Sequence, residues 1–151
     1  MVTETVSADL LGRCAPLSDL TRDARAKLAS IAEERMVPRG TTVFDDMDPA
    51  NRFYLLIKGE ISLYCELGSG EKRVMDTVND GELFAWSALV EPYRYTATAT
   101  ATRDCELIAF DAAKLRTMCR EDVGLGYQMF NKIAEVLSNR LESARVQLAA
   151  S

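Results

Sequence analysis

The chain contains no histidine among its 151 residues. Histidine is the commonest acid–base group in catalysis and the commonest metal ligand, so its absence argues against a histidine-bound metal enzyme or haem protein. The four cysteines, Cys14, Cys65, Cys105 and Cys119, lie far apart and form no Cys-x-x-Cys pair. That spacing argues against a zinc site, an iron–sulfur cluster or a disulfide framework. We therefore expect no bound metal and reduced, mostly buried thiols.

Long apolar runs and basic stripes are also missing. No run approaches the roughly 20 residues that cross a bilayer, and the first residues lack the basic and apolar regions of a signal peptide. The formal net charge is −5, which disfavours nucleic-acid binding by this chain alone, because Lys and Arg supply most of the affinity for phosphates. We predict a cytoplasmic protein that contacts neither membrane nor nucleic acid.

Residue patterns predict short strands between helical ends. Thr21 is the expected N-cap of a helix over Arg22 to Arg35, which Pro38-Arg39-Gly40 ends. Alternating and β-prone residues predict strands over 52–58, 61–67, 72–78, 95–102 and 105–110. Asp111 is the expected N-cap of the helix that follows. A small β-roll with flanking helices is the arrangement that such an order favours.

The segment from Tyr95 to Thr102 alternates with unusual regularity. Tyr95, Ala97, Ala99 and Ala101 fall on one face of the predicted strand, and four threonines fall on the other. Small alanine side chains suit the inner face of a tightly curved sheet. We expect the tyrosine and the alanines to face the interior.

One stretch of sequence carries a family resemblance. The run Gly81-Glu82-Leu83-Phe84-Ala85-Trp86-Ser87, followed by Tyr95-Thr96-Ala97, resembles the phosphate-binding cassette of cyclic nucleotide-binding domains of the Crp/Fnr type. Gly40, Gly59 and Gly81 fit the glycine pattern of that family. The resemblance covers nearly the whole chain and implies an α+β fold: a β-roll, or cupin-like double-stranded jelly roll. It implies one domain over 1–151, with N-terminal helices in 1–40, the roll in 41–110 and C-terminal helices in 111–148.

Three residues depart from the family pattern. Ala85 replaces its glycine, Trp86 its ribose-binding glutamate, and Tyr95 its phosphate-binding arginine. Losing two charged hydrogen bonds costs about 3–6 kcal/mol, so binding of cyclic AMP or cyclic GMP is disfavoured. Glu82 is expected in a turn, and Arg94 is expected to point away from the pocket that Tyr95 faces.

What occupies the altered pocket is open. Trp86 could line it for an aromatic ligand, or Trp86 and Tyr95 could fill it as core. A helix start at Ala85, Trp86 and Ser87, with the Thr96 hydroxyl nearby, could bind a small anion. The unknown ligand is therefore expected to be small and anionic or aromatic.

The last predicted helix, about Leu125 to Leu148, carries a coiled-coil seam whose members step by four and three residues: Phe130, Ala134, Leu137, Leu141, Ala144 and Leu148. The seam, together with the family's habit of dimerising through this helix, predicts a homodimer; a single helix packed on its own roll is the alternative. The family's transcription factors continue into a helix-turn-helix domain. The sequence ends at Ser151 without one, which leaves open whether the natural protein continues.

Three functions follow from these observations. We expect a non-catalytic sensor or regulatory domain. The alternative is a ligand-free interaction module that acts through its helical dimer. A cupin-like enzyme is disfavoured, because such enzymes need clustered metal ligands and the chain has no histidine.

Overall fold

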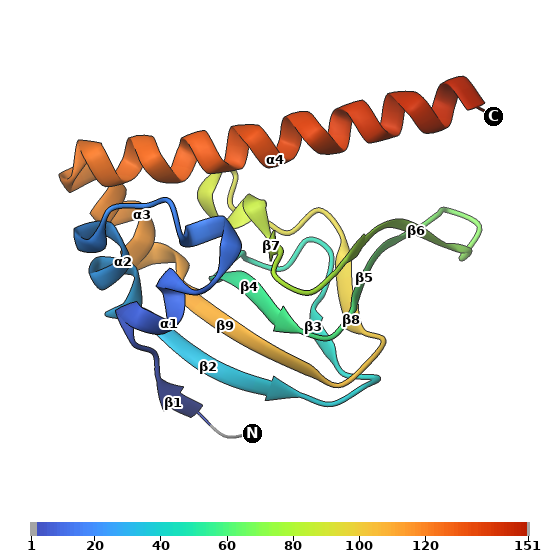
Figure 1. Cartoon of the computed structure of the whole chain (residues 1–151). Coiled ribbons are helices and arrows are strands. Elements are labelled where there is room, and N and C mark those ends of the chain that lie inside the picture. The colour runs from blue at the N-terminus through green and yellow to red at the C-terminus, as the bar shows by residue number, and fades with distance from the viewer. Residues whose placement is uncertain (1–2, 151) are drawn as a thin grey trace. The chain divides into compact units, whose positions relative to one another are not determined.

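The structure of the protein is a computed structural model that describes residues 3–150. The chain forms two compact units, Met1–Arg116 and Thr117–Ser151. The first unit holds the β-roll and the N-terminal helices, and the second holds most of the C-terminal helical segment (Figure 1).

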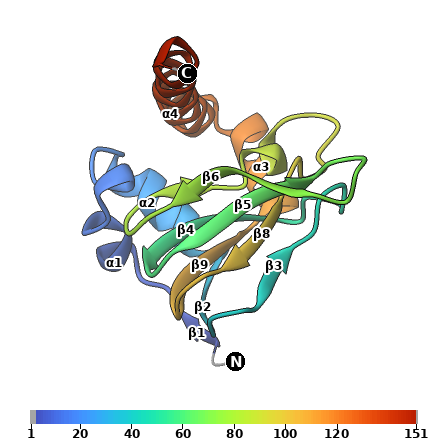
Figure 2. The same cartoon turned by 90° about the vertical axis from the view of Figure 1, so that its right-hand side faces the viewer.

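The first unit is built around two antiparallel sheets. One sheet has the order β1-β2-β9-β4-β7 and the other the order β3-β8-β5-β6, and Figure 2 shows them curling into a roll. The strands of the first sheet are β1 (Thr3–Thr5), β2 (Ala32–Val37), β9 (Cys105–Asp111), β4 (Arg52–Lys58) and β7 (Leu83–Phe84). Those of the second are β3 (Thr42–Phe44), β8 (Thr98–Ala101), β5 (Ile61–Glu66) and β6 (Lys72–Val78). The fold is the predicted α+β β-roll.

The roll is held by apolar side chains from the central strands. The largest fully buried ones on these strands are Phe53, Leu55, Leu56, Ile61, Phe84, Leu107, Ile108 and Phe110. Most come from β4 and β9, which pair along nearly their whole length. Both strands are hydrophobic on successive residues, as expected for strands that are covered on both faces.

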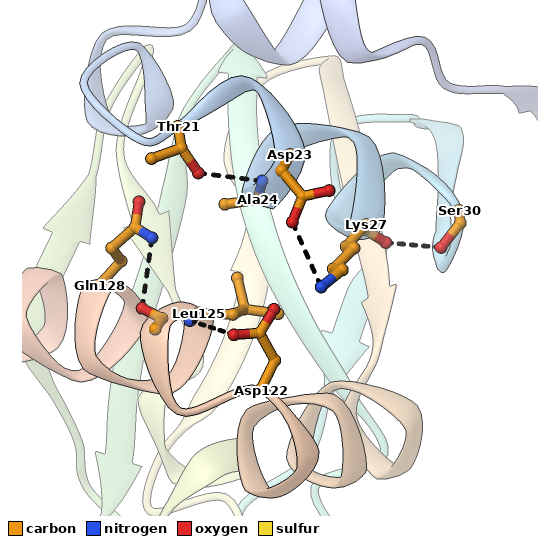
Figure 3. A network of polar contacts seen from close by, with 9 residues as sticks. Thr21, Asp23, Ala24, Lys27, Ser30, Asp122, Leu125 and Gln128 are labelled. Atoms are coloured by element: carbon orange, nitrogen blue, oxygen red, sulfur yellow. Dashed lines mark hydrogen bonds and ion pairs between the residues drawn. The ribbon is translucent and has the colours of Figure 1, made fainter.

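The helices of the first unit are short, and side chains cap two of them, those that begin at Ala8 and Arg22. The helices are α1 (Ala8–Gly12), the 3₁₀ helix η1 (Ala15–Leu17), α2 (Arg22–Ala29) and the 3₁₀ helix η2 (Trp86–Leu89). Thr21 caps α2 as predicted, because its hydroxyl accepts a 3.2 Å hydrogen bond from the Ala24 amide (Figure 3). Asp23 and Lys27 add an i,i+4 ion pair of 3.2 Å.

The helix predicted to reach Arg35 ends at Ala29, and the first forty residues are not all helical. Residues 32–37 form β2, and β1 pairs with it. Antiparallel pairing of β2 with β9 places Ala32 opposite Phe110 and Val37 opposite Cys105. This long-range pairing outweighs the local helical preference of Glu33, Glu34 and Arg35, since propensity differences amount to less than about 1 kcal/mol per residue.

The strand predicted over 95–102 is also shorter, because β8 covers only Thr98–Ala101. Tyr95 instead pairs with a loop: its amide donates to the Asp48 carbonyl (3.0 Å), and its carbonyl accepts from the Met47 amide (2.9 Å). The predicted facing is nonetheless correct for the buried residues Tyr95, Ala99 and Ala101. The backbone pairing of this segment differs from the prediction, but the buried side chains face the interior as predicted.

The C-terminal segment consists of α3 (Ala112–Glu121), which begins in the first unit, and α4 (Val123–Ala150). The predicted cap of α3 is present: the Asp111 carboxylate accepts from the Lys114 amide at 3.0 Å. At the turn into α4, the Asp122 carboxylate accepts from the Leu125 amide at 3.1 Å (Figure 3). A Cβ at Gly126 would lie 2.7 Å from the Cys119 carbonyl oxygen, so this corner requires glycine.

Candidate functional site

The cassette begins with a tight turn after β6. Gly81 has a φ of +80°, a value that glycine adopts without steric cost. The Glu82 carboxylate accepts a 2.6 Å hydrogen bond from the Asn79 amide. The backbone carbonyl of Glu82 accepts a 2.9 Å hydrogen bond from the Leu56 amide. The structure therefore places Glu82 in the turn, where its carboxylate serves the backbone.

Ala85 lies in the left-handed region, with φ 71° and ψ 43°. This conformation costs an L residue about 1–2 kcal/mol relative to its ordinary backbone states. The residues after it, including Ser87, form η2, a 3₁₀ helix of 4 residues. So short a helix adds few aligned peptide dipoles. A left-handed residue therefore precedes a short helix here, and that residue is an alanine although its backbone conformation favours glycine.

Tyr95 is an interior side chain. It is 4% exposed, and its ring stacks on Phe44 with centroids 3.8 Å apart and an interplanar angle of 14°. Its hydroxyl donates to the Arg52 carbonyl (2.8 Å) and accepts from the Arg52 amide (3.2 Å). Burial, and secondarily the nearby Tyr54, raise the pKa of Tyr95 to about 12. The phenol is therefore neutral and hydrogen-bonded at physiological pH.

Tyr95 belongs to a group of four aromatic side chains, which we call the aromatic cluster: Phe44, Tyr54, Phe84 and Tyr95. Phe44 also stacks on Tyr54 at 6.1 Å and on Phe84 at 6.3 Å, and Tyr54 stacks on Phe84 at 5.1 Å. All four are at most 8% exposed. Rings from β3, β4 and β7 thus pack against one another, and that of Phe44 covers Tyr95, which stands where the family pattern has its phosphate-binding arginine.

Trp86 packs elsewhere. The centroid of its ring lies 5.2 Å from that of Phe53, and the Phe53 centroid lies 6.0 Å from that of Phe110. Phe53 and Tyr54 are consecutive on β4, so their side chains leave opposite faces of that strand. The ring contacts therefore assign Trp86 and Tyr95 to opposite faces of β4, although the sequence led us to expect them at one pocket.

The remaining cassette residues are accessible. Thr96 is exposed, and Ala97 is half-buried. Arg94 is exposed and donates to the Met47 carbonyl at 2.9 Å, so it points away from the interior that Tyr95 faces, as predicted. No predicted site residue therefore brings a positive charge to the aromatic cluster from this segment.

Arg116, on α3, is a cassette contact that the sequence analysis missed. Its guanidinium donates a 2.6 Å hydrogen bond to the Ala88 carbonyl in η2. It also lies over the ring of Tyr93, 4.1 Å from the centroid. Nothing in the spacing of Arg116 singled it out, because both of its partners are more than twenty residues away in the chain.

The α4 helix carries an exposed apolar face, which we call the α4 stripe. It contains all the predicted seam residues and two that the prediction missed: Val123, Tyr127, Phe130, Ala134, Leu137, Leu141, Ala144 and Leu148. Its large members are 44–79% exposed. Val123 and Tyr127 continue the four–three spacing toward the N-terminus, a signal that the sequence already contained.

Metal-binding groups and thiols are the features of the described residues that bear on catalysis. Within residues 3–150, no group of three or more His, Cys, Asp or Glu side chains is arranged to hold a metal ion. Burial raises the pKa of the thiols of Cys14, Cys105 and Cys119, which lowers their nucleophilicity at neutral pH. Over the same residues, none of the helices is long and apolar enough to cross a membrane.

Known proteins similar to this chain include transcriptional regulators. A CRP-like cAMP-activated global transcriptional regulator of Mycobacterium tuberculosis is 23% identical over 93% of this chain and 61% of its own length. A cyclic AMP receptor protein of Thermus thermophilus is 26% identical over 79% of this chain and 53% of its own length. The chain thus spans about half to three fifths of these relatives.

The comparison with solved structures agrees with the fold. A putative cyclic nucleotide-binding protein from Geobacter metallireducens has a TM-score of 0.82 and 28% identity, covering 90% of this chain and 98% of that one. A cyclic nucleotide-binding domain from Methylobacillus flagellatus has a TM-score of 0.85 at 13% identity, covering 99% and 88%. The family model described as cyclic nucleotide-binding domain matches residues 34–122, and the chain therefore belongs to that family.

Proposed function

We propose that this chain is a non-catalytic regulatory domain that does not bind cyclic AMP or cyclic GMP through the family's usual contacts. The observation that carries the proposal is the packing of Tyr95. A phosphate there would need a guanidinium, whereas a buried phenol stacked on Phe44 has already satisfied its hydroxyl on the Arg52 backbone. Trp86 offers only an indole N–H donor, which cannot accept from a ribose hydroxyl.

Titration calorimetry with cyclic AMP and with cyclic GMP tests the proposal. We expect no binding tighter than about 10 μM, or about −7 kcal/mol. The comparison protein is the triple variant Ala85→Gly, Trp86→Glu and Tyr95→Arg, checked for folding by circular dichroism. Tighter binding by this variant than by the wild type would support the three replacements as the cause. A wild-type dissociation constant below about 10 μM contradicts the proposal.

An interaction module without any ligand is the second candidate. The aromatic cluster favours it, because one of its four buried rings is that of Tyr95, which stands where the family pattern has its phosphate-binding arginine. A different small anionic or aromatic molecule is the competing possibility. Native mass spectrometry of the protein as purified distinguishes them: a mass excess that disappears on denaturation identifies a ligand, and its absence supports the module.

We also propose that the domain is a homodimer formed through α4. The support is the α4 stripe, since exposed apolar residues at coiled-coil spacing are stabilised when a second helix covers them. Leu137→Glu should yield monomers in sedimentation velocity experiments, whereas Asn139→Glu, exposed and outside the stripe, should leave the dimer intact. A wild-type chain that sediments as a monomer at high micromolar concentration contradicts this proposal.

The expected cytoplasmic location stays a prediction.

A further inference from the structure

Two sulfur atoms from neighbouring strands meet on the hairpin formed by β5 and β6 (Figure 1). The thiol of Cys65 on β5 donates a 3.5 Å hydrogen bond to the thioether sulfur of Met75 on β6. The thiols of Cys14 and Cys105 donate instead to backbone carbonyls. Cys65 thus differs from these two thiols in having a second soft, polarisable sulfur as its neighbour.

Met75 occupies a β-bulge. On β6, Val74 and Asp76 pair with consecutive residues of β5, so Met75 between them has no partner residue of its own. A bulge of this kind redirects the side chain of its extra residue, and here that side chain lies against Cys65. The spacing of the four cysteines argued against a metal site built from thiols alone, but it contained no information about a thioether brought in by strand pairing.

Core packing does not account for the position of Met75. Buried methionines fill irregular gaps between apolar side chains, whereas Met75 is 63% exposed. It also lies on the outer strand of its sheet, and Cys65 beside it is half-buried. A small ion can therefore reach both sulfur atoms from the solvent.

The ligand types and the surrounding charge select the class of ion. Thiolate and thioether sulfurs favour soft cations such as Cu(I), whereas oxygen ligands suit hard ions. Among residues 3–150, no group of three or more His, Cys, Asp or Glu side chains could hold a metal ion, so a four-ligand zinc site is not formed here. Arg73 lies directly opposite Cys65 on β6, and its positive charge repels a divalent ion more strongly than a monovalent one.

The distance between the sulfurs also suits such an ion. With metal–sulfur bonds of about 2.3 Å, a separation of 3.5 Å gives an angle of about 100° at the ion. This angle is close to tetrahedral and leaves positions open for water or a small thiol. A linear arrangement would need the sulfurs about 4.6 Å apart, an opening that rotation of the flexible, exposed Met75 side chain provides.

We propose that Cys65 and Met75 form a two-sulfur binding site for a soft monovalent cation, Cu(I) or Ag(I), on the β5–β6 hairpin. On binding, the Cys65 thiol releases its proton to solvent, and the thiolate and the thioether each donate one lone pair to the ion. No atom changes its oxidation state. The bound ion joins β5 to β6 at the bulge. The site lies outside the cassette, so it is independent of nucleotide binding and of the proposed dimer.

Silver titration with an NMR readout tests whether the thioether is a ligand. The protein is labelled with carbon-13 in its methionine methyl groups, and Met75→Leu identifies the Met75 resonance. One equivalent of silver nitrate in chloride-free buffer should shift the methyl resonance of Met75. Met47 is the matched control, because it is 64% exposed and its resonance should not move. A Met75 resonance that stays in place overturns the proposal.

Competition with bicinchoninate for Cu(I), without oxygen and with ascorbate as reductant, measures the affinity of variants whose folding is checked by circular dichroism. Loss of even an outer partner of a metal ligand weakens binding, so loss of a direct ligand in Met75→Leu should weaken the tightest Cu(I) site at least about tenfold. Cys65→Ser should weaken it further, whereas Met47→Leu and Cys14→Ser should bind as the wild type does. Unchanged affinity in Met75→Leu overturns the proposal, because a single thiol then binds the ion. Loss of the tightest site in Cys14→Ser, but not in Cys65→Ser, overturns it as well.

Discussion

Tyr95→Phe removes one oxygen atom from the aromatic cluster and leaves the ring in place. The variant loses the hydrogen bonds of 2.8 Å and 3.2 Å that join this hydroxyl to the Arg52 backbone. Because buried backbone groups left without partners cost about 1–3 kcal/mol, we expect the free energy of unfolding to fall by about 2 kcal/mol. For a chain of this length that lowers Tm by about 4–8 °C.

The loss should also depend on pH, in a direction that follows from the pKa of Tyr95. An unfolded tyrosine titrates near pH 10, whereas burial holds the folded pKa at about 12. The folded state therefore keeps a proton that the unfolded state releases. This contribution is fully present below about pH 10 and is lost as the pH rises through 12, at about 1.4 kcal/mol per pH unit in between.

Urea unfolding of the wild type and of Tyr95→Phe, followed from pH 8 to pH 11, measures both effects. Their difference in unfolding free energy should stay near 2 kcal/mol up to about pH 10 and fall below about 1 kcal/mol at pH 11. Tyr127→Phe is the control, because this phenol is 71% exposed and its loss should change stability by less than about 0.5 kcal/mol. A Tyr95→Phe protein as stable as the wild type, or a difference that does not change with pH, refutes the packing of Tyr95.

Three further predictions concern two residues with positive φ, Ala85 and Gly59, and the side chain of Arg116. All three are measured by urea unfolding. Ala85→Gly should stabilise the protein by about 1 kcal/mol, because glycine removes the cost of a φ of 71°; a loss would mean that another conformation is populated. Arg116→Met should cost about 2 kcal/mol through its carbonyl hydrogen bond and ring contact, and should change the fluorescence of the single tryptophan. Gly59→Ala should cost about 3 kcal/mol or more, since its Cβ would lie 2.6 Å from the Cys105 sulfur. Gly70→Ala, with a similarly positive φ but nothing within 4 Å, should cost clearly less.

Local signals in the sequence were enough for much of the roll. Thr21 and Asp111 cap helices because their side chains reach amides three residues ahead, a relation that sequence spacing contains. The central strands were predictable in the same way, since β-prone runs ended at turn residues such as Gly59. The glycine and aromatic spacing also pointed to the turn at Gly81 and to the short helix after it.

Features that depend on distant partners could not be read from the sequence. Residues 32–35 continue the helical pattern of α2, and their pairing with β1 and β9 makes them a strand. The cassette pattern predicted where Trp86 lies in the chain, but the direction of its side chain depends on the contact with Phe53. The direction of the Tyr95 side chain depends in the same way on its contact with Phe44. Trp86 and Tyr95 thus pack against different neighbours, and matching residues to a family pattern by position does not reveal such contacts.

The contact of Arg116 has a mechanical consequence for the cassette. One guanidinium joins the Ala88 carbonyl in η2, the ring of Tyr93 in the following loop, and the first turns of α3. A displacement of η2 must therefore either break a 2.6 Å charged hydrogen bond or pull the start of α3 with it. The Arg116 side chain therefore ties η2 and the loop after it to the start of α3 within the first unit.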